Sequence, residues 1–544
     1  MDTHMTKRLL VCAALAVAPM LATAPMLGTT CESLASLKLP STRIIEAHTV
    51  AAGAFTVSPS TPPPPPGQGA FDFSTMPAFC RVQGVIQPSN DSHIEFEVWL
   101  PASGWNGKFE GVGNGGFAGS INYAALAQAV IAGYATSSTD TGHKGGGTDA
   151  MWALGHPEKI VDYGYRAIHE TSEKSKAVVR AFYGEGPQHS YFSGCSNGGR
   201  QALMEAQRYA ADYDGLIAGA PSANFTRIAA GFTWDEQSLE ADPASYIPAN
   251  KFPAIEKAAL AKCDALDGVN DGVIDDPRKC HFDPAILLCK GTESAACLTE
   301  PQIAALKKIY SGPRNSRGEQ VYPGFQPGGE SGANPTLGWA PWFSGPGPSK
   351  SLQYAFATQA DAYMIYQNAA LDYRTVNFDK DLKTGEDAMG ARLNAIDPNL
   401  KALKDRGGKL ILYHGWSDPA LPPTATVNYY ENVVAKMGQK ETASFVRLYM
   451  VPGMSHCALG PGPSSFGAGP ERGADPDFSM FAALERWVEK GAAPDKIIAT
   501  KYKRGGNPTS GVARTRPLCP YPQVARYTGS GSANEAANFA CKLP

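Results

Sequence analysis

The order of apolar and polar positions along the chain predicts strands and helices that alternate. Residues 93–100 alternate between apolar and polar side chains, as an edge strand does, and residues 213–220 form an apolar run typical of a buried strand. Two later apolar runs, residues 408–414 and 446–451, have the same character, whereas residues 164–183 have the composition of a helix. This alternation predicts an α/β protein with a doubly wound sheet.

A long stretch of sequence separates two of these predicted strands. After the strand at 213–220, the next core strand begins only at Lys409, and the residues between them include many aromatic side chains and four cysteines. A connection within the sheet does not need this length, so we interpret residues 225–401 as an inserted lid domain. The core would then be built from residues 27–224 and residues 402–544.

Five residues in the middle of the chain, Gly194-Cys195-Ser196-Asn197-Gly198, have the Gly-x-Ser-x-Gly pattern of a nucleophile elbow. Residues 190–193 before them predict a strand, and residues 199–209 after them are rich in helix-forming side chains. The motif needs this context, because the serine backbone is strained and the helix must pack closely against the strand. A chance glycine-rich turn would lack these flanks. We therefore predict that Ser196 is the nucleophile of an α/β-hydrolase.

The order of elements also predicts the partners of Ser196. In an α/β-hydrolase the acid and the histidine follow the serine, each in a loop after a late strand. Asp418 lies in the turn after the first of the two late strands, and His456 lies in the loop after the second. His456 is also the only histidine beyond Asp418. We predict a triad of Ser196, His456 and Asp418, and we assign no role to His414, which precedes the acid and falls within the strand.

Cysteines flank both the predicted nucleophile and the predicted base. Cys195 directly precedes Ser196, and Cys457 directly follows His456. If the serine and the histidine lie within hydrogen-bonding distance, their neighbours are close enough for a disulfide that holds the base near its nucleophile. The alternative, that Cys195 is itself the nucleophile, needs a free thiolate and does not explain Cys457.

The N-terminus predicts export from the cytoplasm. The basic pair Lys7-Arg8 precedes an apolar run at residues 9–21, and Ala22-Thr23-Ala24 has the small side chains of a cleavage site. We predict a signal peptide at residues 1–26 rather than a membrane anchor, because the apolar run is short. Loss of Cys12 with this peptide leaves ten of the eleven cysteines, an even number that suits a secreted or periplasmic chain.

The composition limits the possible partners. The net charge is −3 at pH 7, and charged residues make up 18% of the chain, below the usual quarter, while glycine and proline are abundant. These values are typical of a loop-rich exported enzyme. The sequence has no basic stripe of the kind that binds nucleic acid, so we expect a small-molecule partner.

An acidic loop within the predicted lid has the character of a metal site. Asp264, Asp267 and Asp271 lie close together, and glycines follow two of them. Calcium takes roughly six to eight oxygen ligands and accepts backbone carbonyls, which a bent loop can supply, although the spacing is not that of an EF-hand. Zinc is disfavoured because the loop offers neither histidine nor a free thiolate. Carboxylates this close would repel one another without a cation, so the loop predicts a structural calcium ion.

These motifs resemble those of the tannase and feruloyl esterase family of α/β-hydrolases. The resemblance rests on Cys195-Ser196, on Asp418 and on His456-Cys457, and it covers nearly the whole chain after the predicted signal peptide. It extends to three further segments: residues 111–117 (GVGNGGF), 139–143 (TDTGH) and 514–522 (RTRPLCPYP).

The resemblance implies further site residues. Asn197, which follows the nucleophile, and Gly116 in the glycine-rich loop would supply the N–H groups of the oxyanion hole. A nucleotide-binding role for that loop is discounted, because the phosphate-loop lysine is absent and the glycine spacing is wrong. The carbonyls of Val269 and Val273 would join the calcium ligands, and Trp339 corresponds to an aromatic, substrate-binding position of the lid. The implied disulfides are Cys31–Cys80, Cys195–Cys457, Cys263–Cys280, Cys289–Cys297 and Cys519–Cys541.

The predicted function is hydrolysis of aromatic acyl esters, of the feruloyl (hydroxycinnamoyl) or galloyl type, through an acyl-enzyme. The family also includes a hydrolase of mono(2-hydroxyethyl) terephthalate, which is an alternative. That enzyme holds the free carboxylate of its substrate with a lid arginine, and no arginine lies between Glu319 and Tyr373 here. A peptidase with the same triad and a non-catalytic, calcium-stabilised binding protein are further alternatives. The intact serine, aspartate and histidine argue against the last one.

Overall fold

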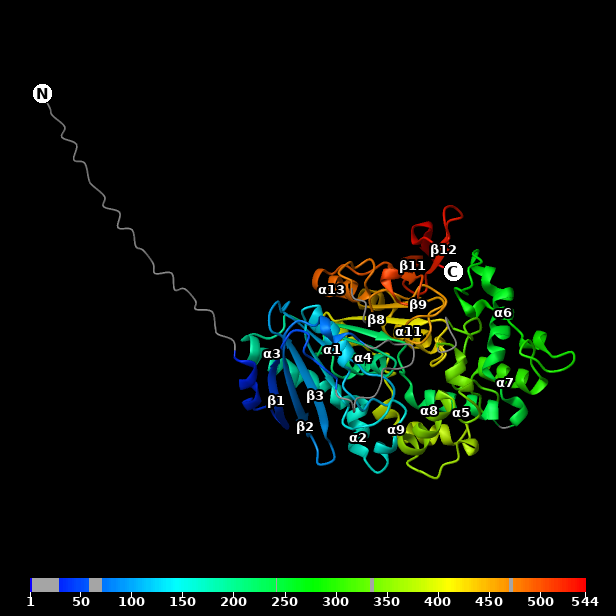
Figure 1. Ribbon diagram of the computed structural model, residues 1–544, viewed down its shortest axis with the longest axis horizontal. Coiled ribbons are helices and arrows are strands. Elements are labelled where there is room, and N and C mark those ends of the chain that lie inside the picture. Colours follow the sequence, from blue (N-terminus) through cyan, green and yellow to red (C-terminus); the bar gives the residue numbers. More distant parts are fainter. Residues whose placement is uncertain (2–28, 58–70, 241, 333–336, 469–472) are drawn as a thin grey trace.

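A nine-stranded mixed sheet forms the centre of the protein (Figure 1). The computed structural model describes residues 1, 29–57, 71–240, 242–332, 337–468 and 473–544, so the predicted signal peptide lies outside the described residues apart from its first residue. The strand order is β1-β2-β3-β5-β4-β6-β7-β8-β9. The strands are β1 (Thr42–Val50), β2 (Phe79–Ile86), β3 (Ile94–Pro101), β4 (Lys108–Val112), β5 (Ala135–Thr139), β6 (His189–Cys195), β7 (Gly215–Gly219), β8 (Lys409–Gly415) and β9 (Val446–Val451).

The sheet has an antiparallel edge and a parallel body. Strand β1 pairs antiparallel with β2, β2 pairs antiparallel with β3, and β3 pairs antiparallel with β5. From β5 through β4, β6, β7 and β8 to β9 every pair is parallel. The carboxyl ends of these parallel strands meet at one edge of the sheet, which is where α/β enzymes place their sites.

Strand β3 is an interior strand, so the prediction of an edge strand at residues 93–100 is wrong. It lies between β2 and β5 and is buried along most of its length. The alternating pattern is misleading because polar Glu97 is buried, being only 3% exposed. Its carboxylate accepts hydrogen bonds from Arg81 (2.8 Å) and from the Trp99 indole (2.7 Å), which replace its contacts with water.

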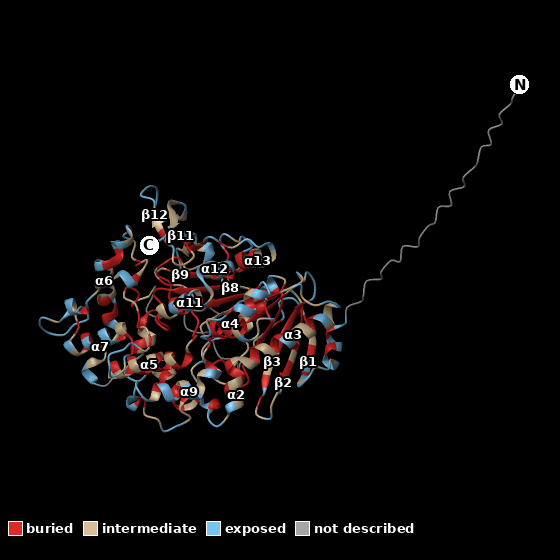
Figure 2. Ribbon diagram, turned by 180° about the vertical axis from the view of Figure 1, so that it is seen from behind, coloured by how far each residue is buried: buried red, intermediate tan, exposed pale blue. Residues whose placement is uncertain are grey.

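Helices cover both faces of the sheet, which confirms the doubly wound α/β-hydrolase prediction. Successive residues of β7 enter different hydrophobic cores: Leu216 packs with helices on one face, and Ile217 packs with helices on the other. The first face carries α3 (Ala167–Tyr183), α4 (Asn197–Arg208) and α11 (Thr424–Met437), and the second carries α1 (Tyr123–Ile131) and α13 (Met480–Lys490). The central strands are accordingly buried along most of their length (Figure 2).

The described chain between β7 and β8 adds no strand to the central sheet. Four of its helices, α5 (Phe225–Glu240), α6 (Phe252–Cys263), α7 (Glu300–Ser311) and α8 (Leu352–Gln359), lie at the end of the protein opposite β1 and β2 (Figure 1). They pack partly around an aromatic core of their own, which includes Phe252, Phe325 and Phe343. Two further helices of this region, α9 (Asp381–Leu393) and α10 (Lys401–Asp405), pack against the rest of the protein: α9 contacts α2 (Pro157–Val161), and Leu403 of α10 is buried in the main core.

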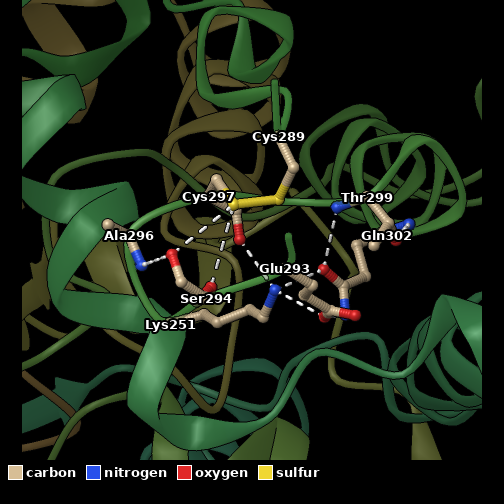
Figure 3. The surroundings of a disulfide bond; sticks show 8 residues. All are labelled: Lys251, Cys289, Glu293, Ser294, Ala296, Cys297, Thr299 and Gln302. Atoms are coloured by element: carbon tan, nitrogen blue, oxygen red, sulfur yellow. Dashed lines mark hydrogen bonds and ion pairs between the residues drawn. A yellow bond between two sulfur atoms is a disulfide. The ribbon is translucent and has the colours of Figure 1, made fainter. Parts of the chain in front are cut away.

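Local crosslinks support this lid, whose backbone is irregular. The Cys289–Cys297 disulfide closes a short loop before α7, and the buried Lys251 lies beside it (Figure 3). The Lys251 ammonium donates to the carbonyl of Cys297 (2.7 Å) and to Oε1 of Gln302 (3.0 Å), and it lies 2.7 Å from Glu293. The buried charge therefore has polar partners, as burial requires.

The structure contains all five disulfides that the resemblance implies. Two of them secure the ends of the described chain: Cys31–Cys80 joins the N-terminal segment to β2, and Cys519–Cys541 lies near the C-terminus. The C-terminal region adds two small hairpins, β10 (Ile497–Tyr502) with β11 (Val512–Leu518) and β12 (Val524–Tyr527) with β13 (Phe539–Lys542). None of the described helices combines the length and apolar character needed to cross a bilayer.

Candidate active site

Ser196 lies at a sharp turn between β6 and α4. Its φ of 63° and ψ of −121° are strained for a residue with a side chain, and its N–H donates to the carbonyl of Gly219 in β7 (3.0 Å). The glycines of the motif allow the close packing. A Cβ on Gly194 would lie 2.6 Å from the backbone of Gly198, and one on Gly199 would lie 2.3 Å from the Gly219 carbonyl. The elbow therefore has the geometry that the sequence predicts.

Asp418 and His456 follow the ends of β8 and β9, and they are hydrogen-bonded to each other. Nδ1 of His456 lies 2.8 Å from Oδ2 of Asp418. The other oxygen, Oδ1, accepts the backbone N–H groups of Ala420 (2.7 Å) and Leu421 (3.0 Å). Asp418 is thus held as a fixed, buried acceptor that sets the orientation of the imidazole.

His414, to which the sequence assigns no role, is a second partner of Asp418. Its Nε2 lies 3.1 Å from Oδ2 of Asp418, and its Nδ1 lies 2.7 Å from the hydroxyl of Thr426. Burial alone would raise the pKa of Asp418, but the charge of His456 and the hydrogen bonds from both histidines outweigh it and hold that pKa well below its usual value. The position of His414 near the end of β8, four residues before Asp418, is the sequence signal for this role.

The Cys195–Cys457 disulfide brings the two loops of the site together. It joins residues 262 positions apart in sequence, with 5.9 Å between the two Cα atoms. Ser196 and His456, the neighbours of these cysteines, line the same cavity. The disulfide therefore fixes the loop of the predicted base beside the elbow.

Gly116 and Asn197 also line this cavity. Gly116 has a positive φ of 53°, and a Cβ there would lie 2.2 Å from the carbonyl of Gly147, so only glycine fits without movement. The Tyr163 hydroxyl donates to the Gly116 carbonyl (3.0 Å), which holds the loop in place. Asn197 is the first residue of α4, so its N–H has no acceptor within the helix. Both residues border the cavity that Ser196 lines, and their role as oxyanion donors stays a prediction.

Arg200, which the sequence gave no reason to select, supports Asn197 from behind. It is fully buried, and its Nε and Nη2 donate to Oδ1 of Asn197 at 2.9 and 2.7 Å. Nη1 and Nη2 also donate to backbone carbonyls, including those of Gly164 (2.8 Å) and Leu393 (3.3 Å) at the end of α9. Within the described chain no carboxylate pairs with this guanidinium. It links the elbow to the lid through these hydrogen bonds and through the ring of Phe225, whose centroid lies 5.9 Å from the guanidinium carbon.

The cavity has a volume of about 460 Å³, including its open mouth, and lies between the core and the lid. Apart from the residues named above and Ser222, its lining is apolar or aromatic, and among the described residues no arginine, lysine or carboxylate lines it. The core contributes Phe117, Tyr163, Ala420 and Leu421, and the lid contributes Phe225, Ile228, Ala229, Phe232, Trp342, Phe356 and Ala360. Such a lining suits a flat, uncharged group.

Trp339 does not reach this cavity, so the prediction that it contacts substrate is corrected. Its side chain is 2% exposed and stacks on Phe343 in the core of the lid, with ring centroids 4.2 Å apart. Trp342 lines the cavity instead, and its ring lies 5.7 Å from that of His456. Trp339 directly precedes a short π-helical turn (Ala340–Ser344) and Trp342 lies within it, so the two side chains enter different surroundings.

The acidic loop follows α6 and contacts the C-terminal hairpin. The two carboxylate oxygens of Asp264 accept the N–H groups of Asp271 (3.1 Å) and Gly272 (2.8 Å), and Oδ1 of Asp267 accepts that of Val269 (2.8 Å). Asp271 pairs with two arginines of the 514–522 segment. Consistent with this pairing, the described carboxylates of the loop do not all converge within 4.8 Å of one another.

The donor chemistry of this loop nevertheless fits a hard cation. Burial raises the pKa of Asp267 to about 6, and the nearby charges of Asp271 and Asp264 add to the rise. Asp267 has no cationic partner within ion-pair distance in the described part of the chain. A cation coordinated by carboxylate and carbonyl oxygens would offset the repulsion between these carboxylates.

Comparison with known proteins agrees with the geometry. Residues 80–542 match the family described as tannase and feruloyl esterase. The chain is 44% identical to an uncharacterised esterase of Xanthomonas campestris, with 94% of this chain and 91% of that protein covered. It is 36% identical to the mono(2-hydroxyethyl) terephthalate hydrolase of Piscinibacter sakaiensis, with 87% and 86% covered. The crystal structure of feruloyl esterase B from Aspergillus oryzae is similar with a TM-score of 0.84 at 30% identity, with 94% of this chain and 99% of that chain covered. The chain belongs to the tannase and feruloyl esterase family.

Proposed function

We propose that this protein is an exported serine carboxylesterase that cleaves esters of uncharged aromatic acids through an acyl-enzyme. The observation that carries the proposal is that Ser196 and His456 line one cavity whose other walls are mostly apolar and aromatic. Family membership supports the same class of reaction.

In the proposed mechanism, Nε2 of His456 takes the hydroxyl proton of Ser196 as the serine oxygen attacks the ester carbonyl. Asp418 accepts a hydrogen bond from Nδ1 and stabilises the imidazolium that forms. The N–H groups of Gly116 and Asn197 would stabilise the oxyanion. His456 then protonates the departing alcohol, and water cleaves the acyl-enzyme by the same steps in reverse.

The lining of the cavity favours an uncharged acyl group. A free carboxylate, as in mono(2-hydroxyethyl) terephthalate, would lose its hydration with no cationic side chain in the described lining to replace it. A galloyl ring brings several hydroxyl groups, whereas Ser222 is one of few polar side chains available and the Tyr163 hydroxyl is already bonded to Gly116. Hydroxycinnamoyl esters therefore fit the cavity best.

We propose in addition that Asp264, Asp267 and Asp271, with the carbonyls of Val269 and Val273, hold a structural calcium ion. The hard-oxygen donor set and the crowded carboxylates support this site. Calcium would crosslink the loop and neutralise it, and it takes no part in the ester chemistry proposed above. The five disulfides support export to an oxidising compartment.

The esterase proposal is tested with purified protein on a panel of esters. We expect kcat/KM for methyl ferulate to exceed that for methyl gallate, for mono(2-hydroxyethyl) terephthalate and for short aliphatic esters. Ser196→Ala should lose about a million-fold in turnover, because no acyl-enzyme forms. A variant that keeps more than about a hundredth of the wild-type rate would refute the nucleophile. Equal or higher kcat/KM on the terephthalate monoester would refute the substrate class alone.

The calcium proposal is tested by chelation. Calcium that binds only the folded state adds stability by mass action, so a chelator should lower the melting temperature and added calcium should restore it. Activity well below the melting temperature should change much less. The matched control is Asp267→Asn, whose melting temperature should respond weakly to both treatments. An unchanged wild-type melting temperature, with no calcium found by elemental analysis, would contradict the site.

A further inference from the structure

A second group of metal-ligand side chains lies in the core, away from the catalytic cavity. It consists of His169 on α3, Glu205 on α4 and Asp212 in the turn between α4 and β7. One donor atom from each residue lies within 4.8 Å of the other two, and the described chain holds no other such group. Glu205 is nine residues after Ser196 on the same helix, or about 14 Å along its axis, and none of the three lines the cavity.

Glu205 is the unusual member of this group. It is 1% exposed, and neither of its carboxylate oxygens has a hydrogen-bond partner among the described residues. No lysine or arginine of the described chain lies within ion-pair distance of it; the nearby Lys176 ammonium donates to the backbone carbonyl of Asp212 instead. A buried carboxylate without a partner is costly, so this group needs a bound proton or a bound cation.

The other two residues are fixed in place beside Glu205. Nδ1 of His169 lies 2.7 Å from Oδ2 of Asp212, and the imidazole stacks on Tyr209 with ring centroids 3.8 Å apart. The side chains of His169 and Asp212 are 22% and 10% exposed, so the group is not sealed from solvent. Burial raises the pKa of Glu205 well above its usual value, and neighbouring Asp212 adds to the rise, because the two carboxylates repel each other.

We propose that His169, Glu205 and Asp212 bind a divalent transition-metal ion of the zinc class. One imidazole nitrogen and two carboxylate oxygens form a donor set that suits zinc, cobalt or manganese, whereas calcium prefers oxygen ligands alone. Metal–ligand distances of about 2.0–2.2 Å require only small shifts of donor atoms that already lie within 4.8 Å of one another. Water would complete the coordination. The ion would tie α3 to the end of α4 and to the turn that enters β7.

The test is a zinc titration of the intact mature protein by calorimetry, with calcium kept in excess so that the acidic lid loop is saturated. We expect one zinc ion per chain and a higher melting temperature with zinc than without it. Glu205→Gln and Asp212→Asn should each weaken zinc binding by about tenfold or more. The matched controls are Glu185→Gln, at an exposed position just after α3, and Asp267→Asn in the lid loop; both should bind zinc as the wild type does.

Two measurements keep the proposal testable if a buried variant fails to fold. His169→Asn changes a half-buried residue and should weaken zinc binding in the same way. Cobalt bound to the wild-type protein should give visible absorption bands that zinc abolishes. The proposal is overturned if the wild type binds no zinc, or if folded Glu205→Gln or His169→Asn binds it as tightly as the wild type. If a folded variant bound zinc as tightly as the wild type, the zinc would be bound outside this group, at a surface histidine.

Discussion

The catalytic site and the lid both bury carboxyl groups, but the pKa of Asp418 in the site is lowered, whereas the pKa values of Asp361 and Glu236 in the lid are raised. In the core, Asp418 faces two histidines, which hold its pKa well below the usual value. In the lid, Asp361 and Glu236 have no cationic partner within ion-pair distance among the described residues: the Thr233 hydroxyl donates to Asp361 and the Ser351 hydroxyl donates to Glu236, each at 2.6 Å. Burial then raises the pKa of Asp361 to about 7 and that of Glu236 to about 8.

This difference separates catalysis from lid stability. Asp418 keeps its charge because two histidines stabilise the carboxylate, and the proposed mechanism needs that charge opposite the imidazolium. The lid provides no such partner, so its acids are most stable when they are protonated and neutral. Removal of a carboxylate should therefore damage turnover in the core, whereas in the lid it should change mainly the response of stability to pH.

The largest expected effect is in the core. Asp418→Asn should lower kcat by about 10⁴-fold, because an amide can hold the wrong imidazole tautomer and cannot stabilise the imidazolium. The melting temperature should change far less. The measurement is kcat on methyl ferulate, with circular dichroism to confirm the fold.

His414→Gln is the matched control for this prediction. Glutamine keeps a polar contact with Asp418 but removes one of the two imidazoles, so kcat should fall by a smaller factor. If His414→Gln reduced kcat as much as Asp418→Asn, the assignment of His456 as the histidine that reacts would be contradicted.

A second, smaller effect separates the two lid tryptophans. Trp342→Ala should raise KM for methyl ferulate about tenfold with little change in the melting temperature, because it removes an aromatic wall of the cavity. Trp339→Ala should do the reverse: it empties the core of the lid, which costs about 3–5 kcal/mol of stability, and leaves substrate contacts in place. Steady-state kinetics and thermal unfolding measure the two effects. A larger KM change in Trp339→Ala would restore the residue as a substrate contact.

The same contrast explains what the sequence could predict. The strands, the helices and the elbow of the core can be predicted from local patterns, because a strand, a turn and a helix around Gly-x-Ser-x-Gly are typical of a nucleophile elbow. The position of Trp342 rather than Trp339 at the cavity depends on a π-helical turn that has no clear sequence signal. Arg200 acts through partners from distant elements, so its role appears only when the fold is known, whereas the spacing of His414 from Asp418 is visible in the sequence. Glu97 misled the pattern of β3 because Arg81, the cation that allows it to be buried, lies on β2.

The smallest expected effect concerns the pH dependence of the lid. A carboxyl group whose pKa is raised on folding binds more protons in the folded state, so its contribution to stability is fully present below its unfolded pKa of about 4. That contribution is lost as the pH rises through about 7 for Asp361 and through about 8 for Glu236. Between these limits each group should lower the free energy of unfolding by about 1.4 kcal/mol per pH unit.

Urea unfolding from pH 5 to 8, followed by lid tryptophan fluorescence with calcium saturating, measures this slope. Asp361→Asn should reduce the slope by about 1.4 kcal/mol per pH unit, the contribution of one proton. Asp387→Asn, at an exposed site on α9, should leave the slope unchanged. If the slope were unaltered in folded Asp361→Asn, Asp361 would be ionised throughout this pH range. The contrast between a lowered pKa at Asp418 and a raised pKa at Asp361 would then be wrong.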